Sequence, residues 1–244
     1  MSLLVLVKLS YFVAATLFLL GLQRMASPKT ARSGIQWAGA GMLIANLATF
    51  FLPGLHNIGL MIAAIVIGVA ANWAWGKKVA ITDMPQMVAL FNGMGGGSAA
   101  AIGAVELVRW SAAGQSPGMV PGVLAALGSL IGAVSLTGSI IAWAKLDGRM
   151  DKRYTFPGQQ WFNAAVALVA VVCGAMALQT LAMPWILAFF VLALALGVLM
   201  TLPIGGADMP VVISLYNAFT GLAVAFEGYV LGNEALIIAG TMVG

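Results

Sequence analysis

The sequence predicts an all-α fold, a polytopic bundle of membrane-spanning helices, and two observations carry this prediction. Of the 244 residues, 62% are hydrophobic and only 7% are charged, with a mean hydropathy of +1.04. Soluble globular domains carry about 25% charged residues. In addition, the apolar residues gather in eight runs of roughly the 20 residues that a spanning helix needs. The composition therefore excludes a soluble fold.

Each apolar run predicts one spanning helix. A ninth run begins near residue 233 and reaches Gly244 after about twelve residues, fewer than a full crossing needs. No Pro/Ser-rich linker separates the runs, so we expect a single transmembrane domain over residues 1–244, with about nine transmembrane helices of which the last is incomplete. The expected spans are residues 3–23, 34–52, 57–76, 84–108, 118–146, 160–180, 182–203, 209–231 and the incomplete 233–244.

The basic residues predict the orientation of the helices. Cytoplasmic loops of membrane proteins are enriched in Lys and Arg, so the N-terminus is expected outside. The positive charge belongs to this topology, and we expect no nucleic-acid partner. Nine of the eleven basic residues lie in the first, third and fifth connections: Arg24, Lys29, Arg32, Lys77, Lys78, Lys145, Arg149, Lys152 and Arg153.

A ten-residue segment occurs twice, four spans apart. Asp83-Met-Pro-Gln-Met-Val-Ala-Leu-Phe-Asn92 recurs as Asp208-Met-Pro-Val-Val-Ile-Ser-Leu-Tyr-Asn217. The aspartate is expected to cap a helix N-terminus, and the proline suits the first turn. At about 1.5 Å per residue, each asparagine lies roughly 13 to 14 Å into a layer about 30 Å thick. Two amides near the midplane can hold helices together or serve a polar pathway, and the sequence leaves both interpretations open.

The fifth run carries a stripe of small residues. Gly128, Gly132, Ser135 and Ser139 follow one another at spacings of 4, 3 and 4 and therefore share one helix face. Close helix packing explains such a stripe, but Ser135 and Ser139 also bracket the expected depth of Asn217. Hydroxyl and amide groups at this depth can order a chain of water molecules.

Titratable groups are not expected in the middle of the membrane. Every carboxylate lies near a helix end or in a loop, with Glu106 and Glu227 on the outer side, and the sole histidine, His56, lies in an outer loop. The single Cys173 and the remaining residues offer no metal-ligand set. Pumps place Asp, Glu or His in the interior as proton carriers, so a partner subunit is expected to supply the group that titrates.

A glycine-rich stretch, Gly93-Met-Gly95-Gly96-Gly97-Ser98, imitates part of a dinucleotide fingerprint. That motif needs a preceding strand and a helix N-terminus that faces water, whereas this stretch lies deep in an expected span. We therefore expect no cofactor in this part of the chain.

Three motifs carry a resemblance to a known family. They are Asp208-Met-Pro with Asn217, Thr137-Gly138-Ser139 followed by Lys145-Leu146-x-Gly148, and Thr82-x-Met84-Pro85. With them, essentially the whole chain resembles the membrane domain of the beta subunit of proton-translocating nicotinamide nucleotide transhydrogenase. In that family, hydride passes from NADH to NADP+ between two soluble domains while protons move inward through the membrane domain.

The resemblance implies roles for four residues. Asn217 and Ser139 match positions implicated in proton translocation, and Asp208 matches a residue implicated in coupling to the NADP(H) domain. Asn92 stands where family members often have a histidine that binds the proton.

The resemblance also implies partners and a location. We expect an alpha-type membrane subunit that supplies the missing histidine, NADP(H) in a domain after the last span, and NAD(H) in the partner subunit. The complex is expected to be a homodimer in the bacterial inner membrane.

Two other functions stay open at this point. A secondary transporter of a small solute would also suit a parallel repeat. A purely structural membrane subunit would use Asn92 and Asn217 only for assembly. Solute uptake without nucleotide would indicate the first, and altered assembly with no flux the second.

Overall fold

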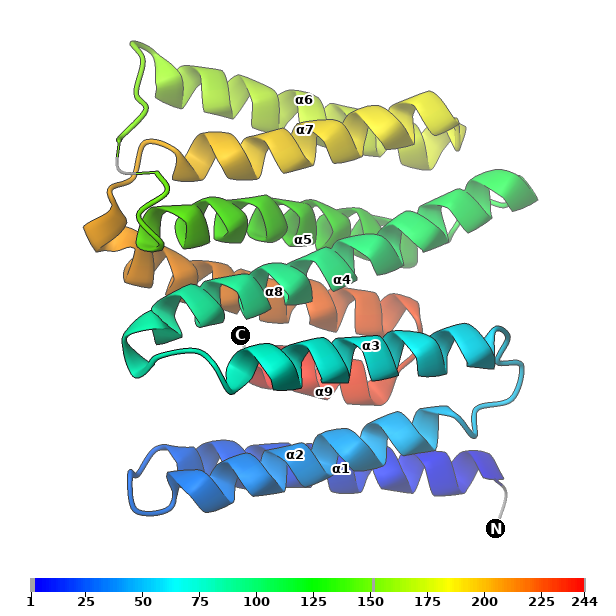
Figure 1. The fold of residues 1–244 in the computed structure, drawn as a ribbon. Coiled ribbons are helices and arrows are strands. Elements are labelled where there is room, and N and C mark those ends of the chain that lie inside the picture. The colour runs from blue at the N-terminus through cyan, green and yellow to red at the C-terminus, as the bar shows by residue number, and fades with distance from the viewer. Residues whose placement is uncertain (1–2, 151, 244) are drawn as a thin grey trace. The chain divides into compact units, whose positions relative to one another are not determined.

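The structure, a computed structural model, describes residues 3–150 and 152–243. Within these residues it is all-helical, as the sequence predicts, with nine α-helices and no strand (Figure 1). Two short 3₁₀ turns, η1 (Ile81–Asp83) and η2 (Gly206–Asp208), precede α4 and α8. The helices are α1 (Leu3–Met25), α2 (Ala31–Thr49), α3 (Ile58–Gly76), α4 (Met84–Ala113), α5 (Met119–Leu146), α6 (Gln159–Thr180), α7 (Met183–Thr201), α8 (Met209–Val230) and α9 (Glu234–Val243).

The chain is a multi-pass membrane protein. Seven of the described helices are long and apolar enough to cross a membrane, whereas α2 and the ten-residue α9 are not among them. Each helix begins within about three residues of its predicted start. The largest difference is the end of α4, which reaches Ala113 instead of residue 108. Its end is set by the left-handed Gly114, with φ 61°, and not by the last apolar residue.

Two compact units make up the chain, residues 1–81 and residues 82–244. In the first unit, α1 packs along α2 through small residues. A Cβ atom added to Gly21 would lie 2.9 Å from the carbonyl oxygen of Gly34, so the two backbones touch there. One polar pair also joins the helices, because the Tyr11 hydroxyl lies 2.9 Å from Thr49 Oγ1.

In the second unit, α5 is the central helix. It packs against α4, α7 and α8, while α6 packs on α7 and α9 on α8 (Figure 1). Glycines set the distance between α4 and α5. A Cβ on Gly132 would lie 2.5 Å from the Gly96 carbonyl oxygen, and a Cβ on Gly96 would lie 2.9 Å from Ser135 Cβ. The stripe of small residues on α5 is therefore a packing surface, and its serines lie inside that surface.

Both copies of the repeat begin a helix in the same way. A 3₁₀ turn ends at the aspartate, and Pro85 and Pro210 follow in the first turn of α4 and α8. The capping prediction is wrong, however, because neither Asp83 nor Asp208 makes a side-chain cap hydrogen bond. An N-cap normally has an extended backbone, whereas the 3₁₀ turn leaves Asp208 at φ −90° and ψ −6°.

The contact between α4 and α5 predicts the effect of one added methyl group. We expect Gly132→Ala to lower the free energy of unfolding by about 1 to 3 kcal/mol, because the new Cβ overlaps the α4 backbone. Denaturation of the purified membrane complex by detergent measures this change. Gly68→Ala is the control, since a Cβ there meets nothing within 4 Å in the described structure. Equal stability of the two variants would contradict the assigned contact.

Candidate functional site

A buried cluster of amide and hydroxyl groups lies where α4, α5 and α8 meet. The Asn92 amide nitrogen donates to Ser139 Oγ at 2.9 Å and to Ser135 Oγ at 3.3 Å. Ser135 Oγ lies 2.5 Å from Thr220 Oγ1. The two serines are fully buried, and Asn92 and Thr220 are 6% and 8% exposed. We call these four residues, Asn92, Ser135, Ser139 and Thr220, the polar cluster.

Local sequence explains how the helices bring these groups together. Ser135 and Ser139 lie one turn apart on the same face of α5. Gly93 and Gly96 on α4 face them, and a Cβ on Gly93 would lie 3.2 Å from Ser139 Cβ. The glycines beside Asn92 therefore leave the space that the serines occupy.

The polar cluster lies well inside the apolar layer. At 1.5 Å per residue, Asn92 is roughly 12 Å from the start of α4 and Thr220 roughly 16 Å from the start of α8. Both depths fall near the middle of a hydrocarbon core about 30 Å thick. One atom of the cluster is unsatisfied: Asn92 Oδ1 is buried and has no hydrogen-bond partner among the described residues. It can accept a hydrogen bond from a water molecule or from a group outside this chain.

Tyr216 extends the polar contacts from the cluster toward α7. Its carbonyl oxygen accepts from Ser135 Oγ at 3.3 Å, and its hydroxyl lies 2.7 Å from Thr201 Oγ1. The Tyr216 ring lies against Gly138, where an added Cβ would lie 2.5 Å from the ring. The small residue in the Thr137-Gly138-Ser139 motif thus makes room for this ring.

Lys145 connects the end of α5 to the segment that leads into α8. Its ammonium group donates to the carbonyl oxygens of Leu202 and Ile204, and the residue is 6% exposed. A cation at this place satisfies carbonyl groups left free where α7 ends. Arg153 lies 3.5 Å from Asp208 at the same end, and both side chains are exposed.

The structure divides the four predicted site residues into two groups. Asn92 and Ser139 meet in the polar cluster. Asp208 lies at the surface, directly before α8. Asn217 lies on an exposed face of α8, next to the buried Tyr216, and not in the buried core with Asn92. The two equivalent asparagines of the repeat thus have different surroundings.

The sequence alone did not single out Thr220, Tyr216 or Glu227. A signal for Thr220 exists in the repeat, because its equivalent 125 residues earlier is Gly95. A Cβ on Gly95 would lie 3.1 Å from Thr220 Cγ2, so the two equivalent positions touch. Glu227 lies near a helix end, as expected, but it is fully buried in the bundle, and Glu106 is only 8% exposed.

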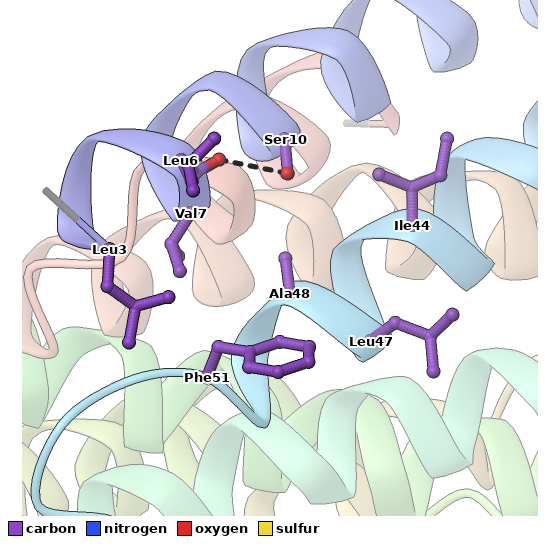
Figure 2. Close-up of a pocket in the computed structure, with 8 residues that line it drawn as sticks. All are labelled: Leu3, Leu6, Val7, Ser10, Ile44, Leu47, Ala48 and Phe51. Atoms are coloured by element: carbon purple, nitrogen blue, oxygen red, sulfur yellow. Dashed lines mark hydrogen bonds between the residues drawn. The ribbon is translucent and has the colours of Figure 1, made fainter. Parts of the chain in front are cut away.

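Two further features, the glycine-rich stretch and a pocket between α1 and α2, do not fit a nucleotide or a polar ligand. Residues 93–98 lie inside the continuous helix α4, so their amides do not form a phosphate-binding loop and the glycines do not break the helix. A pocket of about 380 Å³ between α1 and α2 is lined by hydrocarbon side chains (Figure 2). Its one polar side chain, Ser10, donates to the Leu6 carbonyl oxygen of its own helix at 2.9 Å.

Comparison with known proteins adds to this geometry. Residues 7–244 match the sequence profile of the family described as NAD(P) transhydrogenase beta subunit. The chain is similar to the NAD(P) transhydrogenase subunit beta of Rhodospirillum rubrum, with 39% identity over 240 residues, 96% of this chain and 52% of the relative. The same protein from a named strain of that organism has the same identity and coverage. The chain thus spans about half the length of the curated relatives it matches.

The short contact between Ser135 and Thr220 predicts an energetic coupling between α5 and α8. In a double-mutant cycle with Ser135→Ala and Thr220→Val, we expect a coupling of roughly 0.5 to 1.5 kcal/mol in the free energy of unfolding. Detergent denaturation of the four proteins measures it. Strictly additive effects would show that the two hydroxyls do not interact.

Proposed function

Because the chain belongs to the NAD(P) transhydrogenase beta subunit family, we propose that it couples hydride transfer between NADH and NADP+ to inward proton movement across the membrane. As a member of this family the chain is part of an enzyme complex. The observation that supports the proton role is the polar cluster. Polar groups near the membrane midplane cost free energy, so a cluster of them there is typical of a functional site.

The polar cluster serves as a relay and not as the proton carrier. An asparagine amide and three hydroxyl groups stay uncharged near neutral pH, so they do not carry the proton themselves. They can, however, orient water molecules. The unsatisfied Asn92 Oδ1 is the atom at which a water or a donor from a partner binds. In this proposal, Asn92 and Ser139 orient the water molecules of the relay. Asn217 contributes from α8 when the partner subunit covers that helix.

An alpha-type membrane subunit is the proposed partner. Its histidine would bind the proton beside Asn92, since the chain's own histidine, His56, lies in the α2–α3 connection. The exposed surface of α8 around Asn217 suits a covering helix. The complete complex is proposed to be a homodimer in the bacterial inner membrane.

The nucleotides belong to other parts of the complex. NADP(H) is proposed to bind a domain that follows the last span, and NAD(H) a soluble domain of the partner. Asp208 and Arg153 form an exposed pair at the start of α8, where a soluble domain can dock. A change in that domain would then reach Tyr216 and the polar cluster along α8. The hydride-transfer residues lie outside the chain in this proposal.

The proton role predicts that the asparagines are needed for pumping. In inside-out vesicles carrying the full-length chain and its partner, NADPH and an oxidised NAD analogue should acidify the lumen, as a pH dye reports. We expect Asn92→Leu and Asn217→Leu each to lower this acidification roughly tenfold or more, because each removes a group that orients the proton path.

Asn46→Leu is the matched control. The Asn46 amide is exposed on α2 and donates to the Met42 carbonyl oxygen of its own helix, so pumping should stay at the wild-type level. Solute uptake without nucleotide would instead support a transporter. Wild-type pumping in both the Asn92 and Asn217 variants would show that the polar cluster is only structural.

The partner histidine gives a separate prediction. Replacing it by alanine should abolish acidification while the spans still insert, because no group near Asn92 would then bind the proton. The same dye assay checks this, with membrane content measured by blotting. Intact pumping without the histidine would place the proton-binding group elsewhere.

A further inference from the structure

Glu227 is the buried acidic group that the proposed relay does not use. It lies on α8, three residues before the helix ends, and its exposed fraction is 0%. Neither carboxyl oxygen has a hydrogen-bond partner among the described residues. An isolated carboxylate in an apolar interior is very unfavourable, whereas a carboxyl group that holds a proton is far less so.

Small residues surround the Glu227 carboxyl group and leave room for it. Two glycines face it, Gly103 on α4 and Gly128 on α5, and a Cβ atom on either would lie 2.5 Å from Glu227 Oε1. The Ser129 hydroxyl also faces Gly103, and it is buried with no hydrogen-bond partner in the described part of the chain. Two polar atoms, Glu227 Oε1 and Ser129 Oγ, therefore lie beside Gly103, and neither has a hydrogen-bond partner among the described residues.

Few charged groups face this position. On α4, Glu106 lies one turn beyond Gly103 on the same face, within electrostatic range of Glu227, and it pairs with Arg109 at 2.7 Å. Arg109 is exposed, so the Glu106–Arg109 pair extends to the surface at this end of α4. On α9, which packs on α8, Glu234 is the first residue and exposed. On α5, Ser129 is the polar group that faces Glu227.

Glu227 and the polar cluster lie along the same packing interface, the one between α8 and the α4–α5 pair, which we call the seam. Thr220 and Glu227 are seven residues apart on α8, so they lie on one face and roughly 10 Å apart along the axis. Both side chains face α5: the Thr220 hydroxyl contacts Ser135, and the Glu227 carboxyl group lies against Gly128. Between them the α4 and α5 backbones touch at Gly96 and Gly132, which closes the seam.

We propose that Glu227 is a second proton-binding residue, placed between the outer surface and the polar cluster. The Glu227 carboxylate takes one proton from water near Glu106 and becomes a carboxylic acid. It releases that proton to water ordered by Thr220 and Ser135, and the carboxylate is restored. The inference rests on the proton role proposed above and adds a residue of this chain that itself changes charge.

Glu227→Gln tests the proposal in the vesicle assay with the full-length chain and its partner. Glutamine keeps the size and a hydrogen-bond donor but cannot carry the proton, so we expect acidification to fall roughly tenfold or more. Glu234→Gln is the matched control, an exposed glutamate of the same end of the bundle, and should pump like the wild type.

Two further measurements separate proton binding from folding. Infrared spectra of the wild-type complex should contain a carboxylic-acid carbonyl band that depends on lumen pH and is absent in Glu227→Gln. Glu106→Gln leaves the Glu227 side chain intact, so we expect this variant to keep the carbonyl band that Glu227→Gln lacks.

The outcomes distinguish this inference from the proton role itself. Wild-type pumping in Glu227→Gln together with loss of pumping in Asn92→Leu would overturn the role of Glu227 and leave the polar cluster in place. Wild-type pumping in both variants would overturn both proposals. An unchanged carbonyl band in Glu227→Gln would show that the protonated group is another residue.

Discussion

The contact between the backbones of α4 and α5 at Gly96 and Gly132 is the constraint on which the rest of the second unit depends. Two helices in lipid gain little from burying apolar surface against each other, so close packing of small residues holds them together. Here a Cβ atom on Gly132 would overlap the α4 backbone. This approach brings Asn92 within hydrogen-bond distance of Ser139. The same glycine stripe leaves room for Glu227 beside Gly128.

The polar groups along this seam have their hydrogen bonds satisfied to different degrees. Ser135, Ser139 and Thr220 use one another or Asn92 as partners. Asn92 Oδ1 and the Glu227 carboxyl group have none among the described residues. Buried polar atoms without partners are rare in native proteins because each costs free energy. Water, a proton or a partner subunit can satisfy them, and the proposed proton pathway would supply all three.

Much of the fold follows from the sequence because a membrane allows few solutions. Only helices satisfy their own backbone groups in lipid, so apolar runs separated by charges predict helix positions closely. The repeat also predicts where α4 and α8 start, since proline suits a first turn. The missing caps at Asp83 and Asp208 were not predictable, because the 3₁₀ turn before each helix changes the backbone angles of these two residues.

The sequence by itself determined the membrane class, the helix positions, and the stripe on α5 that holds Ser139. It also placed Asn92 and Asn217 at one depth, because depth depends only on the distance from a helix start. The tertiary structure alone decided which side chains meet: Asn92 is buried against Ser139 and Asn217 is exposed on α8. It likewise decided that Glu227, near a helix end, is buried with no hydrogen-bond partner among the residues that the structure describes. The physical reason is that a helix's rotation against its neighbours is set by packing between distant residues, which spacing along one helix does not contain.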